Sequence, residues 1–338
     1  MARSDFRAEL SDAVSVRTVL LVLGVLVVQL AFVASYVGAF HHPSAHAIEV
    51  GVVAPGGTAG QLAQRLDAAD GHPVAARVVA SRSEASRQVR AKGLTAALVV
   101  DPSGTTDELL VASGGGTSLV TAVEQVATQF EAAQHRTVTV TDLVPLQKGD
   151  ARGLSGFYLV IGWLVGGYLV ASLLGVAKGA RPANLRRGVI RLGATVPYAV
   201  ASGLGGALIV DQLLGALTGH FWALAGLGAL LVLSAATVTM AFEVLFGTVG
   251  IGVTVLLFVV LGNPSAGGAY QAQLLPALWR GLGQWLPNGA GTEAVRRIVY
   301  FGGHGTGAEI LLIVAYVLAG TLVTLLAVAR RKGVGAAG

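Results

Sequence analysis

Two carboxylates stand in otherwise apolar surroundings, where an acidic group could perform chemistry. Glu243 is the only charged residue between positions 221 and 262, and Asp211 directly follows an uncharged stretch, 192–210. An acidic group inside a membrane is a candidate functional group. Simpler explanations are that Glu243 lies at the tip of a tight turn and that Asp211 lies at the membrane interface. Both residues are therefore candidate intramembrane polar residues, with these two alternatives open.

A second candidate site is the basic segment 178–191, which carries five Lys or Arg residues and no acid. Its middle begins like a turn, and residues 185–191 are predicted to continue as a short basic helix. Such a segment could contact a cytoplasmic partner, or its charges could only fix the orientation of the chain. The candidate contact residues are Arg181, Pro182, Asn184, Leu185, Arg186 and Arg187.

A third candidate is the Gly- and Pro-rich loop 263–307. Apolar residues recur at helical spacing over 274–286, Asn288-Gly289 interrupts the pattern, and Thr292 is placed to cap a second short helix, 293–300. We expect two short helices that dip into the outer side of the membrane, with interfacial tryptophans; the alternative is a loop packed on an outer domain. Arg280, Arg296 and Arg297 indicate a structured loop with partners for these charges. The candidate residues of this outer gate are Asn263, Pro264, Pro276, Trp279, Trp285, Pro287, Asn288 and Glu293.

Motifs for enzymatic chemistry are missing from the sequence. There is no G-x-x-x-x-G-K-[ST] phosphate loop, no G-x-S-x-G elbow and no H-E-x-x-H pair. His41, His42 and His46 are close in sequence and could bind a metal. Their spacing is not specific for a metal site and fits a solvated linker, and the chain has no cysteine ligand. We therefore predict no catalytic, cofactor or metal site, and no ATP hydrolysis by this chain alone.

The elements that must position these residues follow from composition. The 338 residues are 54% hydrophobic and 12% charged, about half the charge of a soluble protein. Five apolar stretches near 18–40, 153–177, 192–215, 221–262 and 308–329 are long enough to cross a bilayer, which needs about 20 residues. The stretch 221–262 is long enough for a hairpin of two spans. The fold class is therefore a polytopic α-helical membrane protein with six transmembrane helices.

The ends of the first span leave two questions open. Residues 1–17 form a cytoplasmic segment, either an interfacial helix or a solvated tail. Residues 18–40, followed by Ala45-His46-Ala47, imitate a secretory signal, but an apolar core of 23 residues favours an uncleaved anchor.

Residues 41–152 have the charge balance of a soluble domain, with 9 basic and 11 acidic residues. Strand-like runs near 48–54, 74–80, 96–100, 108–112 and 137–144 alternate with helical patterns near 58–69, 83–92 and 117–135. This alternation predicts an α/β domain with a largely parallel sheet, inserted between the first and second spans. Residues 153–329 then form a five-helix membrane domain, and 330–338 a cytoplasmic tail.

Orientation follows from the positive charges of the short loops. Three groups of positive charges lie on the same side of the membrane only if the number of spans is even. They are Arg3, Arg7 and Arg17 near the N-terminus, the segment 178–191, and the run Arg330-Arg331-Lys332. Both termini are therefore predicted in the cytoplasm, with the α/β domain, 41–152, outside.

A family resemblance is carried by Trp279 and by four segments of the chain. These are Gly262-Asn263-Pro264-Ser265-Ala266-Gly267-Gly268, Leu274-Leu275-Pro276, Trp285-Leu286-Pro287-Asn288-Gly289-Ala290 and Tyr300-Phe301-Gly302-Gly303. The chain resembles the type-2 ABC exporter permease superfamily, in particular its YhgE/Pip (phage infection protein) branch. The resemblance is fairly specific over 244–328, weaker over 153–239, and covers the outer domain in position and size only.

This resemblance implies a membrane subunit of the bacterial plasma membrane that dimerises, works with a separate cytoplasmic ABC ATPase, and exports an unidentified, amphiphilic substrate. It implies no nucleic-acid partner and no cofactor. The competing hypothesis is an envelope scaffold, secretion accessory or receptor-like protein without a transport cycle.

Overall fold

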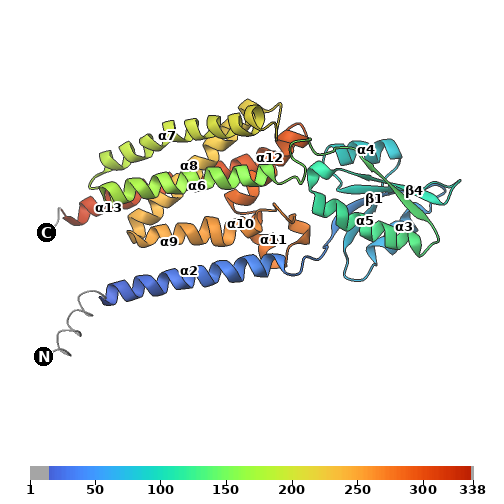
Figure 1. The fold of residues 1–338 in the computed structure, drawn as a ribbon, viewed down its shortest axis with the longest axis horizontal. Helices are drawn as coiled ribbons and strands as arrows, with labels where there is room; N and C mark the ends of the chain where they lie inside the picture. Colours follow the sequence, from blue (N-terminus) through green and yellow to red (C-terminus); the bar gives the residue numbers. More distant parts are fainter. Residues whose placement is uncertain (1–14, 336–338) are drawn as a thin grey trace.

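A computed structural model describes residues 15–335 of the chain. Most of the predicted N-terminal segment, 1–17, lies outside the described residues. A long helix, α2 (Val16–Phe40), leads into an α/β unit, which is followed by a helical bundle. In Figure 1 the α/β unit forms one end of an elongated molecule, and the first turn of α2 and the last turns of α13 (Gly307–Gly335) lie at the other end.

The α/β unit is built on a five-stranded sheet in the order β2-β1-β3-β4-β5. All strand pairs are parallel except β3–β4. The connection between β3 and β4 is only residues 100–105, too short for the crossover that a parallel pair needs, so these strands form an antiparallel pair. The strands are β1 (Ile48–Val53), β2 (Val74–Val78), β3 (Ala96–Val99), β4 (Thr106–Val111) and β5 (Thr137–Asp142).

Three helices cover both faces of this sheet. Side chains of α3 (Ala59–Asp67) and α5 (Thr117–Ala132) pack in one apolar cluster, and those of α4 (Arg82–Arg90) pack in another. The period-2 and period-3.6 patterns are strong here, and every strand and helix lies within three residues of its predicted position.

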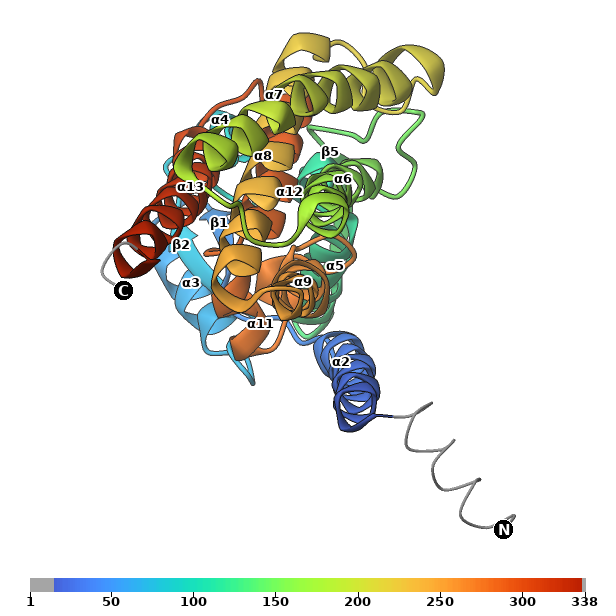
Figure 2. The same cartoon turned by 90° about the vertical axis from the view of Figure 1, so that its left-hand side faces the viewer.

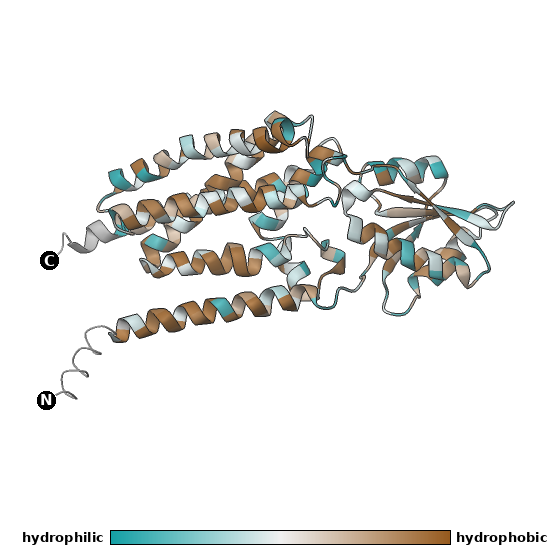
Figure 3. Cartoon of the chain, in the orientation of Figure 1, coloured by the Kyte–Doolittle hydropathy of each residue, from teal (hydrophilic) through white to brown (hydrophobic). Residues whose placement is uncertain are grey.

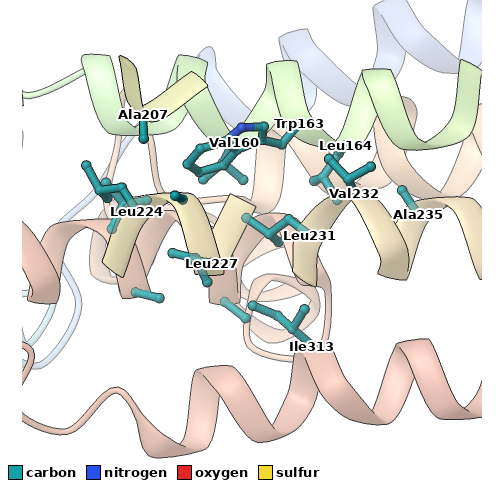
Figure 4. Close-up of a cluster of buried hydrophobic side chains, with 14 of the residues drawn as sticks. Val160, Trp163, Leu164, Ala207, Leu224, Leu227, Leu231, Val232, Ala235 and Ile313 are labelled. Carbon is teal, nitrogen blue, oxygen red and sulfur yellow. The ribbon is translucent and has the colours of Figure 1, made fainter. Parts of the chain in front are cut away.

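The bundle is organised around α8 (Phe221–Phe246), which packs against α6 (Ser155–Lys178), α7 (Leu185–Ala207) and α13. Figure 2, viewed along the bundle, shows α8 in the centre. The core around the N-terminal half of α8 is shown in Figure 4, where Trp163 lies among leucines and small residues and its Nε1 donates to the Ser202 carbonyl at 3.1 Å. Figure 3 shows that apolar residues cover these helices.

Close helix packing depends on glycines that face α8. A Cβ atom added to Gly167 of α6, Gly203 of α7 or Gly320 of α13 would collide with the α8 backbone. Small residues allow such approach between membrane helices. Gly162 and Gly166, which have G-x-x-x-G spacing, are not the α6 glycines in closest contact: Gly162 has nothing within 4 Å of an added Cβ.

Five helices among the described residues are long and apolar enough to cross a membrane, which indicates a helical membrane protein: Thr18–Phe40, Ser155–Lys178, Leu185–Leu213, Phe221–Phe246 and Gly307–Arg330. The third includes a π-helical extension of α7, η2 (Leu208–Leu213). The predicted second arm of the hairpin is the shorter helix Val249–Ser265, made of α9 (Val249–Val255), π-helical η3 (Leu256–Gly262) and α10 (Asn263–Ser265).

Helix α2 stands beside the bundle rather than inside it (Figures 1 and 2). Only 6% of its most apolar 18-residue stretch is buried. The C-terminal half of α2 contacts the short helix Val249–Ser265, where the Ser35 hydroxyl donates to the Val260 carbonyl. The rest of its apolar surface is exposed, as expected of a helix whose solvent is lipid.

One predicted boundary is wrong. Residues 185–191 do not form a separate basic helix: they are the first turns of α7, because Asn184 caps the helix there. Helix α13 continues to Gly335, but its membrane-length apolar part, Gly307–Arg330, ends where the run Arg330-Arg331-Lys332 begins.

Candidate functional site

The predicted outer gate contains two short helices, as expected, but their boundaries differ from the prediction. They are α11 (Ala277–Gly283) and α12 (Pro287–Tyr300), preceded by a 3₁₀ turn, η4 (Ala272–Leu274). The break falls at 284–286, since Pro287 occupies the first turn of α12, where its missing N–H costs nothing. Thr292 is therefore no cap; it lies inside α12 and donates to the Asn288 carbonyl at 2.8 Å.

Asn288 and Asn263 hold α12 against the end of the short helix. The Asn288 side-chain nitrogen donates to the Asn263 side-chain oxygen at 2.8 Å and to the Phe258 carbonyl at 2.9 Å. Both asparagines are buried. A Cβ on Gly283 would overlap the Ser265 carbonyl, so α11 also packs backbone to backbone. These contacts make the outer gate a compact element.

The remaining gate residues differ in exposure. Trp279 is buried in an apolar cluster that includes Ala39 of α2, while Trp285 is 67% exposed. Of the two predicted interfacial tryptophans, only Trp285 has its ring on the surface. Pro264 is buried within α10, and Pro276 immediately precedes α11.

Glu293, on α12, is the centre of a charged cluster. Its carboxylate pairs with Lys92, with Arg296 at 3.2 Å and with Arg297 at 2.8 Å. Arg297 also reaches Glu309 of α13 at 3.4 Å. The prediction that Arg296 and Arg297 have partners is confirmed. Among the described residues, Arg280 forms no ion pair or side-chain hydrogen bond.

Lys92 joins this cluster from the α/β unit, just after α4, and no pattern in the sequence singles it out. Burial lowers the pKa of the Lys92 amine to about 8, although the Glu293 carboxylate opposes the shift. The amine also lies 5.5 Å from the centre of the Phe301 ring. Lys92 and Glu293 are far apart in sequence, and neither neighbourhood contains a signal that pairs them.

Hydrogen bonds fasten the α/β unit to the loop 266–275 and to α12. The Ser118 hydroxyl donates to the Ala269 carbonyl at 2.7 Å, and the Leu119 N–H donates to the buried Gln271 side chain at 3.2 Å. The Tyr300 hydroxyl donates to the Asp150 carboxylate at 2.7 Å. These contacts, together with the Lys92–Glu293 pair, make a continuous polar seam.

A cavity of about 1150 Å³ lies along this seam, between the α/β unit, the outer gate and the start of α13. Its volume exceeds the roughly 300–1,000 Å³ of ordinary ligand pockets. Four basic and three acidic residues line it, together with apolar side chains of α13. The lining includes Glu49, Lys92, Gln271, Arg280, Trp285, Glu293, Arg296, Arg297, Glu309, Leu311, Leu312 and Ala315.

The predicted partner-contact segment lies at the opposite end of the bundle. Arg181 donates to the Val244 and Leu245 carbonyls, both at 3.3 Å, and so caps the end of α8. Asn184 caps α7 through the Arg187 N–H at 2.9 Å. Pro182 is partly buried between these caps, while the side chains of Leu185, Arg186 and Arg187 are exposed at the start of α7. Only part of the predicted set is therefore free to contact a partner.

Glu243 and Asp211 are both buried in the structure, at 2% and 7% exposure. Glu243 lies in the last turn of α8 rather than at the tip of the turn, which begins at Gly247, and its carboxylate packs against Gly175 of α6. Its Oε1 has no hydrogen-bond partner. Asp211, in η2, accepts from the Gly219 N–H at 3.3 Å and so closes the loop between α7 and α8.

Across residues 15–335, no group of three or more His, Asp or Glu side chains is placed to hold a metal ion. His41 and His46 instead contact the backbone carbonyls of Val37 and Ser44.

Comparison of the chain with protein-family models, with curated proteins and with solved structures found no match. The arguments for function therefore rest on the geometry of the cavity, the seam and the two ends of the bundle.

Proposed function

We propose that this chain is the membrane subunit of an exporter of the type-2 ABC kind, which works as a homodimer with a separate cytoplasmic ATPase. The observation that carries the proposal is the cavity of about 1150 Å³ at the junction of the bundle and the α/β unit. A site at one end of a membrane bundle, with charged and apolar walls, suits a molecule that is passed between membrane and water.

The proposed topology has six spans in a bacterial plasma membrane, with both termini in the cytoplasm and residues 41–152 outside. The start of α2, the link between α6 and α7 and the end of α13 share one end of the molecule, opposite the sheet (Figure 1), which supports this arrangement. In this proposal the shorter apolar helix Val249–Ser265, which precedes α13 in the chain, is the additional span. At 1.5 Å per residue it is about 25 Å long, close to the hydrocarbon thickness, and a slight thinning of the bilayer accommodates it.

Topology is tested with single cysteines in this cysteine-free chain. Ser103→Cys, between β3 and β4, should react with a membrane-impermeant maleimide in intact cells. Ala183→Cys, between α6 and α7, should react only after the membrane is opened. The reverse pattern, or equal labelling of both, would contradict the proposed topology.

ATPase coupling is proposed to use Arg186 and Arg187, whose side chains are exposed at the inner end. Replacing both by Gln should abolish co-purification with the proposed cytoplasmic ATPase, while Lys178→Gln, an exposed basic neighbour, should not. Arg181 and Arg191 hold helix ends together, so they are left intact. Unchanged co-purification of the double variant would exclude these two residues as the contact.

A scaffold without a transport cycle is the second candidate, because hydrogen bonds and an ion pair of the polar seam fasten the α/β unit to the outer gate. A disulfide across the seam tests whether the α/β unit has to move relative to the gate. If Ser118→Cys and Ala269→Cys can be crosslinked without loss of function, the seam is static and a scaffold or a transport cycle confined to the bundle is favoured. Loss of export that returns on reduction favours an exporter whose α/β unit moves.

A further inference from the structure

The walls of the large cavity differ in chemistry from one end to the other. Next to the α/β unit, Lys92, Arg296 and Arg297 gather around Glu293. Together with Arg280 of α11, which also lines the cavity, we call them the basic cluster. Along α13, the lining begins with Ala308 and Glu309 and continues with Leu311, Leu312 and Ala315. At 1.5 Å per residue, the apolar wall extends about 10 Å from Glu309 towards the middle of the bundle.

The charges of the cavity favour a ligand with one negative charge. Four basic residues and three acidic ones line it, so the lining carries a net charge of 4 − 3 = +1. Glu293 and Glu309 are already engaged by basic residues of the cluster. Arg280 has no acidic partner among the residues that the structure describes. A guanidinium group of this kind binds a carboxylate or phosphate through two parallel hydrogen bonds.

The apolar side of the cavity reaches the surface of the bundle. Leu311 is 69% exposed, and Trp285 across from it also has most of its ring exposed, although both line the cavity. The Tyr316 hydroxyl donates to the Trp285 carbonyl at 2.9 Å, so the break between α11 and α12 is held against α13 at this place. In a membrane protein, surface of this composition contacts acyl chains, and the cavity is therefore continuous with lipid.

From this gradient we infer that the cavity binds a monoanionic amphiphile, with the anionic head at Arg280 and the acyl chain along α13 between Leu311, Ala315 and Trp285. A phosphodiester head and a carboxylate head share the chemistry that Arg280 recognises. The inference names the substrate class of the proposed exporter and rests on that function for its physiological meaning. Binding itself requires neither an ATPase nor a dimer.

The test uses the full chain in dodecyl maltoside, with Trp222→Phe to remove the other strongly exposed tryptophan. Phosphatidylglycerol and phosphatidylcholine with brominated acyl chains are titrated separately, and quenching of Trp285 fluorescence reports a chain in the cavity. The monoanionic lipid should half-saturate at about one-tenth the mole fraction of the zwitterionic lipid, because both lipids carry the phosphodiester but only phosphatidylcholine carries a choline cation, which Arg280 repels. This tenfold difference corresponds to about 1.4 kcal/mol. Equal half-saturation for the two lipids would overturn the inference.

Arg280 variants show whether the preference arises at the cavity. Arg280→Gln should abolish the difference between the lipids, Arg280→Lys should keep part of it, and Arg65→Gln, an exposed arginine of α3, should leave it intact. Each variant must retain the thermal midpoint of the parent, and if Arg280→Gln does not, the Arg280→Lys titration decides alone. An unchanged preference in Arg280→Gln would refute the site.

Two further arms separate this inference from its alternatives. Inorganic phosphate at 10 mM, roughly ten-thousandfold above a micromolar dissociation constant, should not displace the brominated lipid. Displacement would mean that the site takes a soluble anion. If the wild-type chain shows no preference between the two lipids but associates with an ATPase, the proposed ligand class is refuted and the exporter is not. If it prefers the monoanionic lipid but associates with no ATPase, the exporter is refuted and the ligand class is not.

Discussion

Replacement of Glu293 by Gln removes the one carboxylate that three cations share. Lys92, Arg296 and Arg297 would keep their positive charges in a region where their side chains are 19%, 9% and 23% exposed. Removing one partner of a buried ion pair typically costs about 3–5 kcal/mol. The partial exposure here screens part of that, so we expect a loss of about 2–4 kcal/mol in the attachment of the α/β unit to α12.

The loss is measured as the thermal midpoint of the full chain in detergent, followed by the fluorescence of its tryptophans. At about 2–4 °C per kcal/mol, Glu293→Gln should lower the midpoint by roughly 4–16 °C. Glu84→Gln is the matched control, because Glu84 pairs with Arg87 at an exposed site where such a pair contributes about 0–1 kcal/mol. Its midpoint should stay close to that of the wild type.

A double variant separates the cluster from general damage to α12. Lys92→Met in the Glu293→Gln background removes one orphaned cation, so the pair of changes should cost less than the sum of the single changes. Burial already lowers the pKa of Lys92 to about 8, which shows that the charged amine is costly at this place. A midpoint for Glu293→Gln equal to that of the wild type, or strict additivity in the double variant, would refute the reasoning.

Three further predictions concern other parts of the chain. Burial, and after it the neighbouring Asp107 carboxylate, raises the pKa of Glu131 to about 7, so this group stabilises the fold below about pH 4.5 and loses that contribution as the pH rises to about 7. Glu131→Gln should therefore remove this part of the fall in thermal midpoint between about pH 4.5 and about 7. Parallel curves of midpoint against pH for the variant and the wild type would contradict the prediction. Glu243→Gln should leave the midpoint unchanged or raise it, because a buried carboxylate oxygen without a hydrogen-bond partner is unfavourable; a clear decrease would reveal a missed partner. Gly203→Val should sharply reduce the folded yield on size exclusion, because its side chain would meet the α8 backbone, whereas Gly205→Val has nothing within 4 Å and should be tolerated; equal yields would argue against the helix packing.

The sequence by itself determined the elements that depend on local pattern. Apolar stretches of about 20 residues indicated the long helices, because a bilayer requires that length whatever the neighbours are. The strands and helices of 48–142 were also predictable, since alternation with period 2 or 3.6 reflects which face of each element is buried. The two short helices of the outer gate were predictable as well, but their break was not. Asn288-Gly289 is typical of a turn, yet Pro287 starts α12 and places both residues inside the helix.

Tertiary structure decided which of the singled-out residues come together. Glu243 was expected at a turn, yet it is buried against Gly175, a contact that depends on how α6 packs on α8. Lys92 carried no signal at all, because its partner Glu293 lies 201 positions away and meets it only when the α/β unit docks on α12. The cavity arises in the same way, from surfaces of three separate segments, none of which encloses a space alone. Burial and pairing of charges depend on long-range packing, and no local pattern in the chain encodes it.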